Sequence, residues 1–168
     1  MYKRQVFNVL GPLSHPGRPK RQVVGVADSK AAPKMADVLA ATGSERSLVV
    51  TGHLEIDEFS VTGPSSVIDV ANGQISSYEV DPAACGIEVV DPAVLAGGDA
   101  AANADIATRI FAGESDPRRG MIELNAAAGL VAAGVADTLS AGVQAASAAI
   151  DDGGAAAKVA ALVEHTNR

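Results

Sequence analysis

At 168 residues, 48% of them hydrophobic, the chain has the length and composition of one soluble globular domain with its own core. Its net charge of −7 argues against a nucleic-acid backbone as the main partner, and 3% aromatic residues argue against base stacking. The sequence contains neither an apolar run of ~20 residues, as a membrane span requires, nor a signal-peptide pattern. A single cysteine, Cys85, excludes an internal disulfide framework and suits a reducing compartment. We therefore expect a cytoplasmic protein that binds neither nucleic acid nor membrane.

The first predicted element is residues 6–10, which can form either a helix or a strand, and Gly11-Pro12 is its predicted stop. A proline-rich loop follows and leads into the basic residues Arg18, Lys20 and Arg21. Such a cluster can meet an anion, but a basic run at the start of a strand is more often a solvated edge.

Two short apolar runs, residues 23–26 and 48–50, predict strands that are buried on both faces. The segment between them predicts a helix with Pro33 near its start and Gly43 at its end. The apolar face of this helix is predicted to consist of Met35, Val38 and Leu39. Because strand–helix–strand units normally pair their strands in parallel with a right-handed crossover, the fold class is α/β.

Three carboxylates, Glu55, Asp57 and Glu58, follow the second strand after a break at Thr51-Gly52. Ligands of open α/β sheets bind just beyond the carboxyl ends of the strands, and carboxylates there suit Mg²⁺ completed by substrate phosphates. Adjacent residues of a regular strand point to opposite faces, so Asp57 and Glu58 can share a site only from irregular backbone. The alternative is that acidic residues after a strand form a solvated loop.

The middle of the chain predicts a hairpin and several helix caps. Residues 67–70 and 75–80 are predicted strands joined by Asn72-Gly73, because Asn-Gly is a strong turn signal. Asp81-Pro82 and Asp91-Pro92 each predict a capped helical turn. The glycine pair before Asp99 can cradle phosphate at a helix start, but we favour capping by Asp99, because its charge would repel an anion.

From Met121 onward the pattern predicts alanine-rich packing helices, and alanine and glycine in their apolar stripes allow close contact between elements. The predicted stripes are Leu124, Ala128 and Val131; then Leu139, Val143, Ala146 and Ile150; then Val159, Leu162 and Val163. The predicted sheet is thin for so many helices, since parallel sheets normally have several strands and are covered on both faces. We therefore expect a partial mixed or parallel sheet flanked by helices, and a chain that forms the back half of a larger domain.

Several segments together resemble anthranilate phosphoribosyltransferase, and the similarity covers nearly all of the chain after about residue 4. They are the segment Phe7 to Pro16, Arg21 to Val26, Leu54 to Ser60, Thr62-Gly63-Pro64, Gly97-Gly98-Asp99 with Asn103-Ala104, and Leu124-Asn125-Ala126-Ala127. The first and third are the specific motifs.

The resemblance implies a Mg²⁺-dependent enzyme of tryptophan biosynthesis that joins anthranilate to phosphoribosyl pyrophosphate (PRPP) and releases pyrophosphate. Its fold would be that of the nucleoside phosphorylases and related phosphoribosyltransferases. Asp57 and Glu58 match the acidic pair that holds Mg²⁺ against the donor phosphates. Gly11 matches a position along the anthranilate channel, where a missing side chain leaves room for the ring, although Gly11 can equally be a helix stop.

Residues 1–168 match only the carboxyl-terminal part of the large domain of this family. The family's glycine-rich pyrophosphate loop and its N-terminal helical domain, which forms the homodimer contact, are absent from the sequence. The resemblance therefore implies that the 168 residues alone have negligible transferase activity and that the full-length protein is a homodimer. Two alternatives remain at this stage, a pyrimidine nucleoside phosphorylase-like enzyme and a non-catalytic binding domain.

Overall fold

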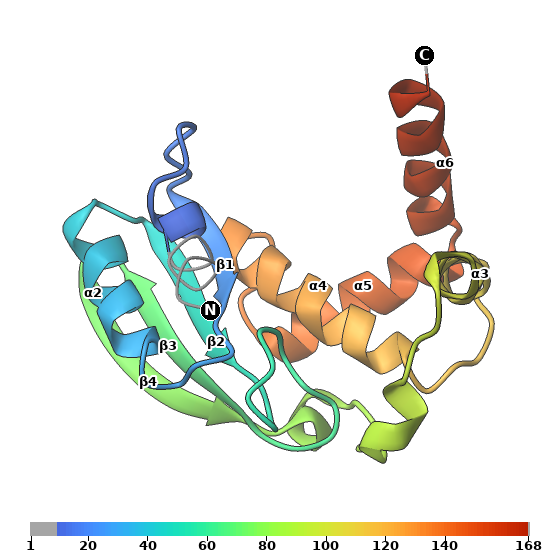
Figure 1. Ribbon diagram of the computed structural model, residues 1–168, viewed down its shortest axis with the longest axis horizontal. Helices are drawn as coiled ribbons and strands as arrows, with labels where there is room; N and C mark the ends of the chain where they lie inside the picture. The colour runs from blue at the N-terminus through green and yellow to red at the C-terminus, as the bar shows by residue number, and fades with distance from the viewer. Residues whose placement is uncertain (1–9, 168) are drawn as a thin grey trace.

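The computed structural model describes residues 10–167, which form a four-stranded mixed sheet with helices on both faces (Figure 1). The strand order is β1-β2-β3-β4, with β1 and β2 parallel and the two remaining pairs antiparallel. The strands are β1 Arg21–Gly25, β2 Arg46–Thr51, β3 Ser65–Ala71 and β4 Gln74–Val80. The α-helices are α2 Ala32–Ala41, α3 Ala100–Phe111, α4 Arg119–Ala133, α5 Leu139–Asp151 and α6 Gly154–Thr166. The predicted α/β class, the mixed sheet and the parallel first pair are confirmed. Burial on both faces is confirmed for β2 but is wrong for β1, where Val23 is 37% exposed because β1 is an edge strand.

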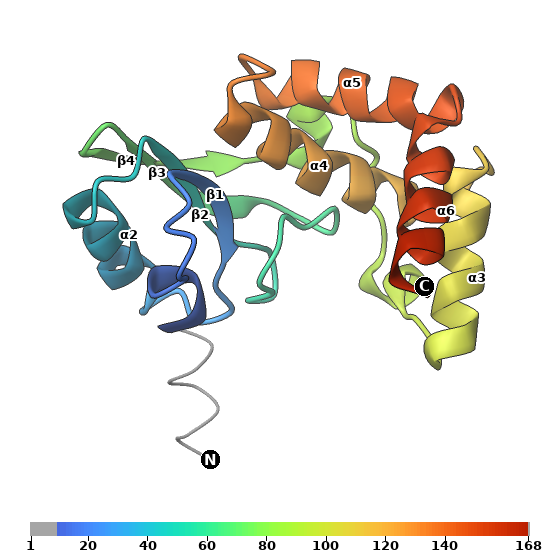
Figure 2. The ribbon, with the colours of Figure 1, turned by 90° about the horizontal axis from the view of Figure 1, so that it is seen from above.

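Helix α2 covers one face of the sheet (Figures 1 and 2). Met35 and Leu39 are buried there against Val24, Val49 and Val70 of the strands. Pro33 lies in the first turn, as predicted. Val38 was predicted on the same face but is 39% exposed, because the buried stripe runs through Ala32, Met35, Ala36 and Leu39 and leaves position 38 at its margin.

Helices α4 and α5 lie over the opposite face of the sheet (Figure 2). The predicted stripe of Leu124, Ala128 and Val131 is fully or almost fully buried and packs with strand residues such as Leu48 and Val50. Small residues do bring the helices close together. A Cβ on Gly142 of α5 would lie 2.8 Å from the Cα of Ala127 in α4.

The hairpin and the caps follow the prediction. Ala71 pairs with Gln74 across the Asn72-Gly73 turn, where both turn residues have positive φ. Asp81 and Asp91 each cap a short 3₁₀ turn, Pro82–Cys85 and Pro92–Leu95, and Asp99 caps α3 by accepting the N–H of Ala102.

Two expectations about the ends of the chain are wrong. The helix does not stop at Gly11-Pro12 but continues through Leu13, and the Ser14 N–H donates to the Leu10 carbonyl at its end. Residues 6–9 of this predicted element lie outside the described range. The stripe of α6 is exposed, with Leu162 at 63%, because α6 packs against α3 and α5 and stands away from the sheet (Figures 1 and 2). Among residues 10–167, no helix has both the length and the apolar character for crossing a membrane.

Candidate functional site

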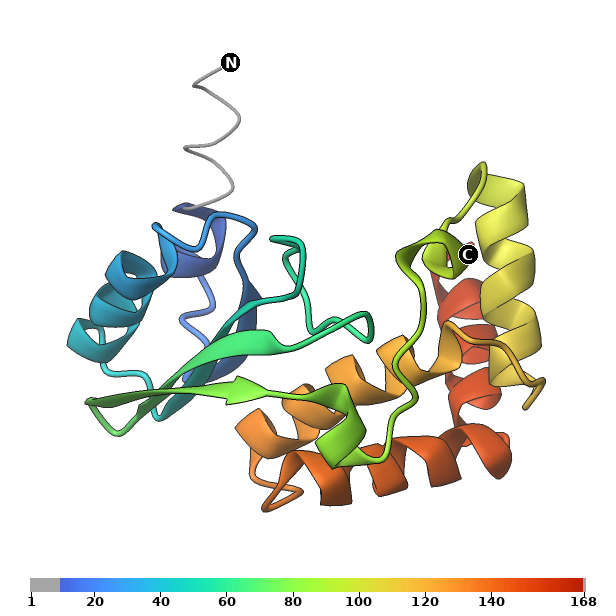
Figure 3. The ribbon, with the colours of Figure 1, turned by 90° about the horizontal axis from the view of Figure 1, so that it is seen from below.

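The acidic segment lies against the carboxyl ends of the two parallel strands (Figure 3). Gly25 is the last residue of β1, and Gly52 directly follows β2. A Cβ on Gly25 would overlap the carbonyl oxygen of Asp57, and a Cβ on Gly52 would overlap the carbonyl oxygen of Glu58. The two glycines therefore let the backbone of the acidic pair approach the sheet edge where α/β proteins bind ligands.

The backbone of this segment is irregular, as the prediction for a shared site required. The Gly52 N–H donates to the Ile56 carbonyl at 2.9 Å and closes a tight reversal of the chain. Leu54 and Glu55 have φ values of 66° and 55°, a left-handed conformation that non-glycine residues seldom adopt. The reversal places Asp57 and Glu58 beside the strand ends.

Asp57 and Glu58 are both exposed and close enough to influence each other's charge. The pKa of the Glu58 carboxyl is raised above its ordinary value, first by partial burial and second by the negative charge of Asp57. The third carboxylate of the predicted cluster is engaged elsewhere, because Glu55 accepts a 3.0 Å hydrogen bond from the Ser29 hydroxyl. Asp57 therefore influences the charge of Glu58, whereas Glu55 already has a hydrogen-bond partner in Ser29.

These donors fit a hard cation that shares its coordination with a ligand. Within residues 10–167, no group of three or more His, Cys, Asp or Glu side chains is placed to hold a metal ion. Mg²⁺ needs no such cage, because it is commonly bound through one or two carboxylates together with water and substrate phosphates. Two exposed neighbouring carboxylates are chemically suited to be the protein's share of such a set.

A cavity of about 770 Å³ opens beside Asp57. Its wall includes residues 23–25 at the end of β1 and residues 26–28 of the following loop. Pro12 also lines it, so the segment after Gly11 reaches the Asp57 cavity. A pocket of this size accommodates a small-molecule substrate.

Gly11 itself is exposed, and a Cβ built on it would meet nothing within 4 Å. It does not line the Asp57 cavity, whereas its neighbour Pro12 does. The open space around Gly11 is compatible with a channel wall, whereas the alternative role of a helix stop is wrong, because the helical turn continues through Leu13.

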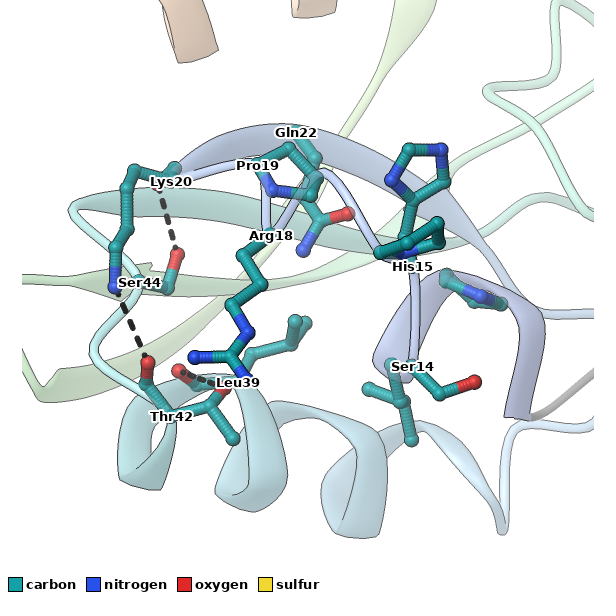
Figure 4. Close-up of a pocket in the computed structure, with 12 residues that line it drawn as sticks. Ser14, His15, Arg18, Pro19, Lys20, Gln22, Leu39, Thr42 and Ser44 are labelled. Carbon is teal, nitrogen blue, oxygen red and sulfur yellow. Dashed lines mark hydrogen bonds between the residues drawn. The ribbon is translucent and has the colours of Figure 1, made fainter.

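A second cavity, of about 710 Å³, lies at the other end of β1, between the 12–22 segment and the end of α2 (Figure 4). It includes two of the clustered basic residues, but Lys20 donates to the carbonyls of Thr42 at 3.3 Å and Gly43 at 2.9 Å and so stabilises the carboxyl end of α2. Arg21 pairs with Glu45 at 3.1 Å. These bonds favour the structural interpretation of the basic cluster.

Two contributors to the site, Gly25 and Ser29, were not predicted from the sequence. Gly25 interrupts the apolar run Val23 to Val26, and a glycine inside a strand pattern signals close approach of another backbone. Ser29 carried no signal, because its bond to Glu55 depends on a contact between two loops. Cys85 is half-buried, and burial raises the pKa of its thiol above the ordinary value.

Comparison with known proteins agrees with this architecture. The family described as glycosyl transferase family, α/β domain, matches residues 2–156. Anthranilate phosphoribosyltransferase from Solibacter usitatus is 44% identical over 161 residues, which cover 96% of this chain and 47% of the relative. The enzyme of the same name from Pelotomaculum thermopropionicum is 44% identical over 163 residues, again 47% of its length. The chain thus spans about half the length of the curated relatives it matches.

Solved structures give the same result. Anthranilate phosphoribosyltransferase from Thermus thermophilus superimposes with a TM-score of 0.80 at 34% identity, over 89% of this chain and 44% of that one. The Saccharomyces cerevisiae enzyme in complex with PRPP and Mg superimposes with a TM-score of 0.77 at 26% identity and the same coverage. The match over residues 2–156 places this chain in the glycosyl transferase family that is defined by its α/β domain.

Proposed function

We propose that this chain forms the Mg²⁺-binding part of an anthranilate phosphoribosyltransferase of tryptophan biosynthesis. The observation that carries the proposal is the close approach of the Asp57 and Glu58 backbone to Gly25 and Gly52, at the carboxyl ends of the parallel strands. The 44% identity to enzymes of that name supports the substrate assignment.

In the proposed reaction the amine nitrogen of anthranilate bonds to the anomeric carbon of PRPP. The bond from that carbon to pyrophosphate breaks, pyrophosphate leaves with the electron pair, and the nitrogen loses a proton. Bound Mg²⁺ would supply positive charge that neutralises the departing pyrophosphate. Asp57 and Glu58 hold the ion in this proposal, and Gly11 lies along the path of the anthranilate ring.

The proposal predicts metal-dependent donor binding that requires both carboxylates. We expect Mn²⁺, used as a paramagnetic stand-in for Mg²⁺, to broaden the amide NMR signals of residues 52–58 in the presence of PRPP. Asp57→Asn combined with Glu58→Gln should weaken this effect about tenfold or more, because the substitutions remove both anionic oxygen ligands. The measurement is signal broadening against Mn²⁺ concentration at fixed PRPP.

Asp137→Asn with Glu79→Gln is the matched control, since both side chains are exposed and lie outside the acidic segment. This control should keep the wild-type response. PRPP binding that is indifferent to the metal and to the Asp57 and Glu58 substitutions would contradict the transferase proposal and favour a non-catalytic binding domain. For the whole protein we also propose a cytoplasmic homodimer.

A further inference from the structure

We propose that Asn125 of α4 is the positioning residue of the acidic pair, an inference that builds on the proposed metal site. Its side chain forms hydrogen bonds with both backbone groups of Phe59, the residue directly after Glu58. Asn125 belongs to the Leu-Asn-Ala-Ala segment of α4, which the site described above does not use.

The side-chain amide of Asn125 makes the two hydrogen bonds to the Phe59 backbone that a neighbouring strand would make in a sheet. Its Oδ1 accepts the Phe59 N–H at 2.9 Å, and its Nδ2 donates to the Phe59 carbonyl at 2.9 Å. Nδ2 also donates to the Met121 carbonyl one turn earlier in α4, at 2.9 Å. The bond to Met121 fixes the orientation of the amide on α4, so α4 determines where the Phe59 backbone lies.

The chain is exposed at Glu58 and completely buried at the next residue. The Phe59 side chain is 0% exposed and packs in the core with Leu124, the residue before Asn125. The following Ser60 N–H is bound by the Ser65 hydroxyl at 2.9 Å. Phe59 and Ser60 thus form a rigid anchor from which Glu58 and then Asp57 project.

Asparagine suits this role for a chemical reason. Binding a backbone N–H and its own carbonyl together requires one acceptor and one donor on the same short, planar group. Aspartate would lose the donor and would face the Phe59 and Met121 carbonyls with a negative charge. Alanine would leave the buried Phe59 N–H and carbonyl without these partners.

Amide hydrogen exchange tests the positioning role without any metal. In the wild-type protein we expect slow exchange at the Phe59 N–H. Asn125→Ala should accelerate exchange at the Phe59 N–H about tenfold or more, because it removes the acceptor of that amide, while Val49 and Val50 in the sheet stay protected. Asn125→Asp creates no cavity but loses the donor to the Phe59 carbonyl, so it should accelerate exchange at the Phe59 N–H by a smaller factor and keeps the test valid if the alanine variant unfolds.

Asn103→Ala is the matched control, because Asn103 binds the Gly98 N–H and carbonyl in the same manner, at 2.8 and 3.1 Å, at the start of α3. It should leave exchange at the Phe59 N–H unchanged. Unchanged exchange at this amide in either Asn125 variant, or a fast Phe59 N–H in the wild type, would overturn the inference.

Metal affinity separates this inference from the proposed function. If the acidic pair binds Mn²⁺ with PRPP, then Asn125→Ala should weaken that binding about tenfold, as loss of an outer support commonly does, and Asn103→Ala should not. If wild-type protein binds no metal but Asn125→Ala still accelerates exchange at the Phe59 N–H, the metal site is wrong and the positioning role stands. Where the wild type does bind the metal, unaltered binding in both Asn125 variants would refute the role even if the exchange changes.

Discussion

Replacing Gly25 by alanine is expected to lower the free energy of unfolding by about 3 kcal/mol, a large effect for one methyl group. A Cβ at this position would overlap the carbonyl oxygen of Asp57, which is backbone and cannot move aside by a rotamer change. Either β1 or the acidic segment must shift. Urea denaturation followed by circular dichroism measures the loss, and the NMR shifts of Asp57 and Glu58 report the displacement.

Gly129→Ala is the control for this substitution. Gly129 lies on the exposed side of α4, and a Cβ there would meet nothing within 4 Å. Since alanine is the better helix former, this variant should gain about 0.5–1 kcal/mol. A Gly25→Ala protein as stable as the wild type, with unmoved Asp57 signals, would show that the strand end and the acidic segment are not in contact.

Phe59→Ala is expected to cost about 3–5 kcal/mol of unfolding free energy. Phe59 is 0% exposed in the core between the sheet and α4, and truncation of a buried aromatic side chain leaves a cavity that surrounding residues only partly fill. Domains of this size commonly have a stability of about 5–15 kcal/mol, so a large part of the total is at risk. The urea midpoint and its slope give the measurement.

Two comparisons make this result specific to burial. Phe59→Leu keeps most of the volume and should cost less than about 1.5 kcal/mol. Phe111→Ala makes the same chemical change at a half-buried position at the end of α3, and we expect a smaller loss there. Equal losses at positions 59 and 111 would mean that Phe59 is not the anchor of the acidic segment.

Together, the contacts describe an acidic pair whose position is set from two sides. Gly25 and Gly52 let its backbone lie against the strand ends, and Asn125 holds the chain directly after it. Preorganisation of this kind matters for a metal site completed by a substrate, because ligands held in place lose less conformational entropy when the ion binds.

Much of the fold followed from local sequence signals. The parallel β1–β2 pair follows from two apolar runs separated by one helix, and the β3–β4 turn follows from Asn72-Gly73. Asp81, Asp91 and Asp99 cap their helical turns through bonds to residues two or three positions ahead. Such features depend on neighbours in the chain, so the sequence alone specifies them.

Exposure of individual helix faces was harder to predict. Val38 lies at the margin of the buried face of α2, although its apolar side chain looked equivalent to those of Met35 and Leu39. In α6, Leu162 and Val163 are more than half exposed even though the helix packs against α3 and α5. An apolar stripe predicts that a face can be buried, but only the positions of other elements decide whether it is.

For the candidate site, too, some features were visible in the sequence and others depended on the tertiary structure. Its acidic residues were visible in the sequence as three carboxylates after a buried strand, and the family resemblance singled out Asp57 and Glu58 among them. The hydrogen bond that engages Glu55 with Ser29 was decided only in the tertiary structure. The same is true of Gly25 against Asp57 and of Asn125 on Phe59, a pair 66 residues apart. Local signals act over a few residues, whereas these contacts exist only after the sheet and α4 have packed and brought distant backbone segments together.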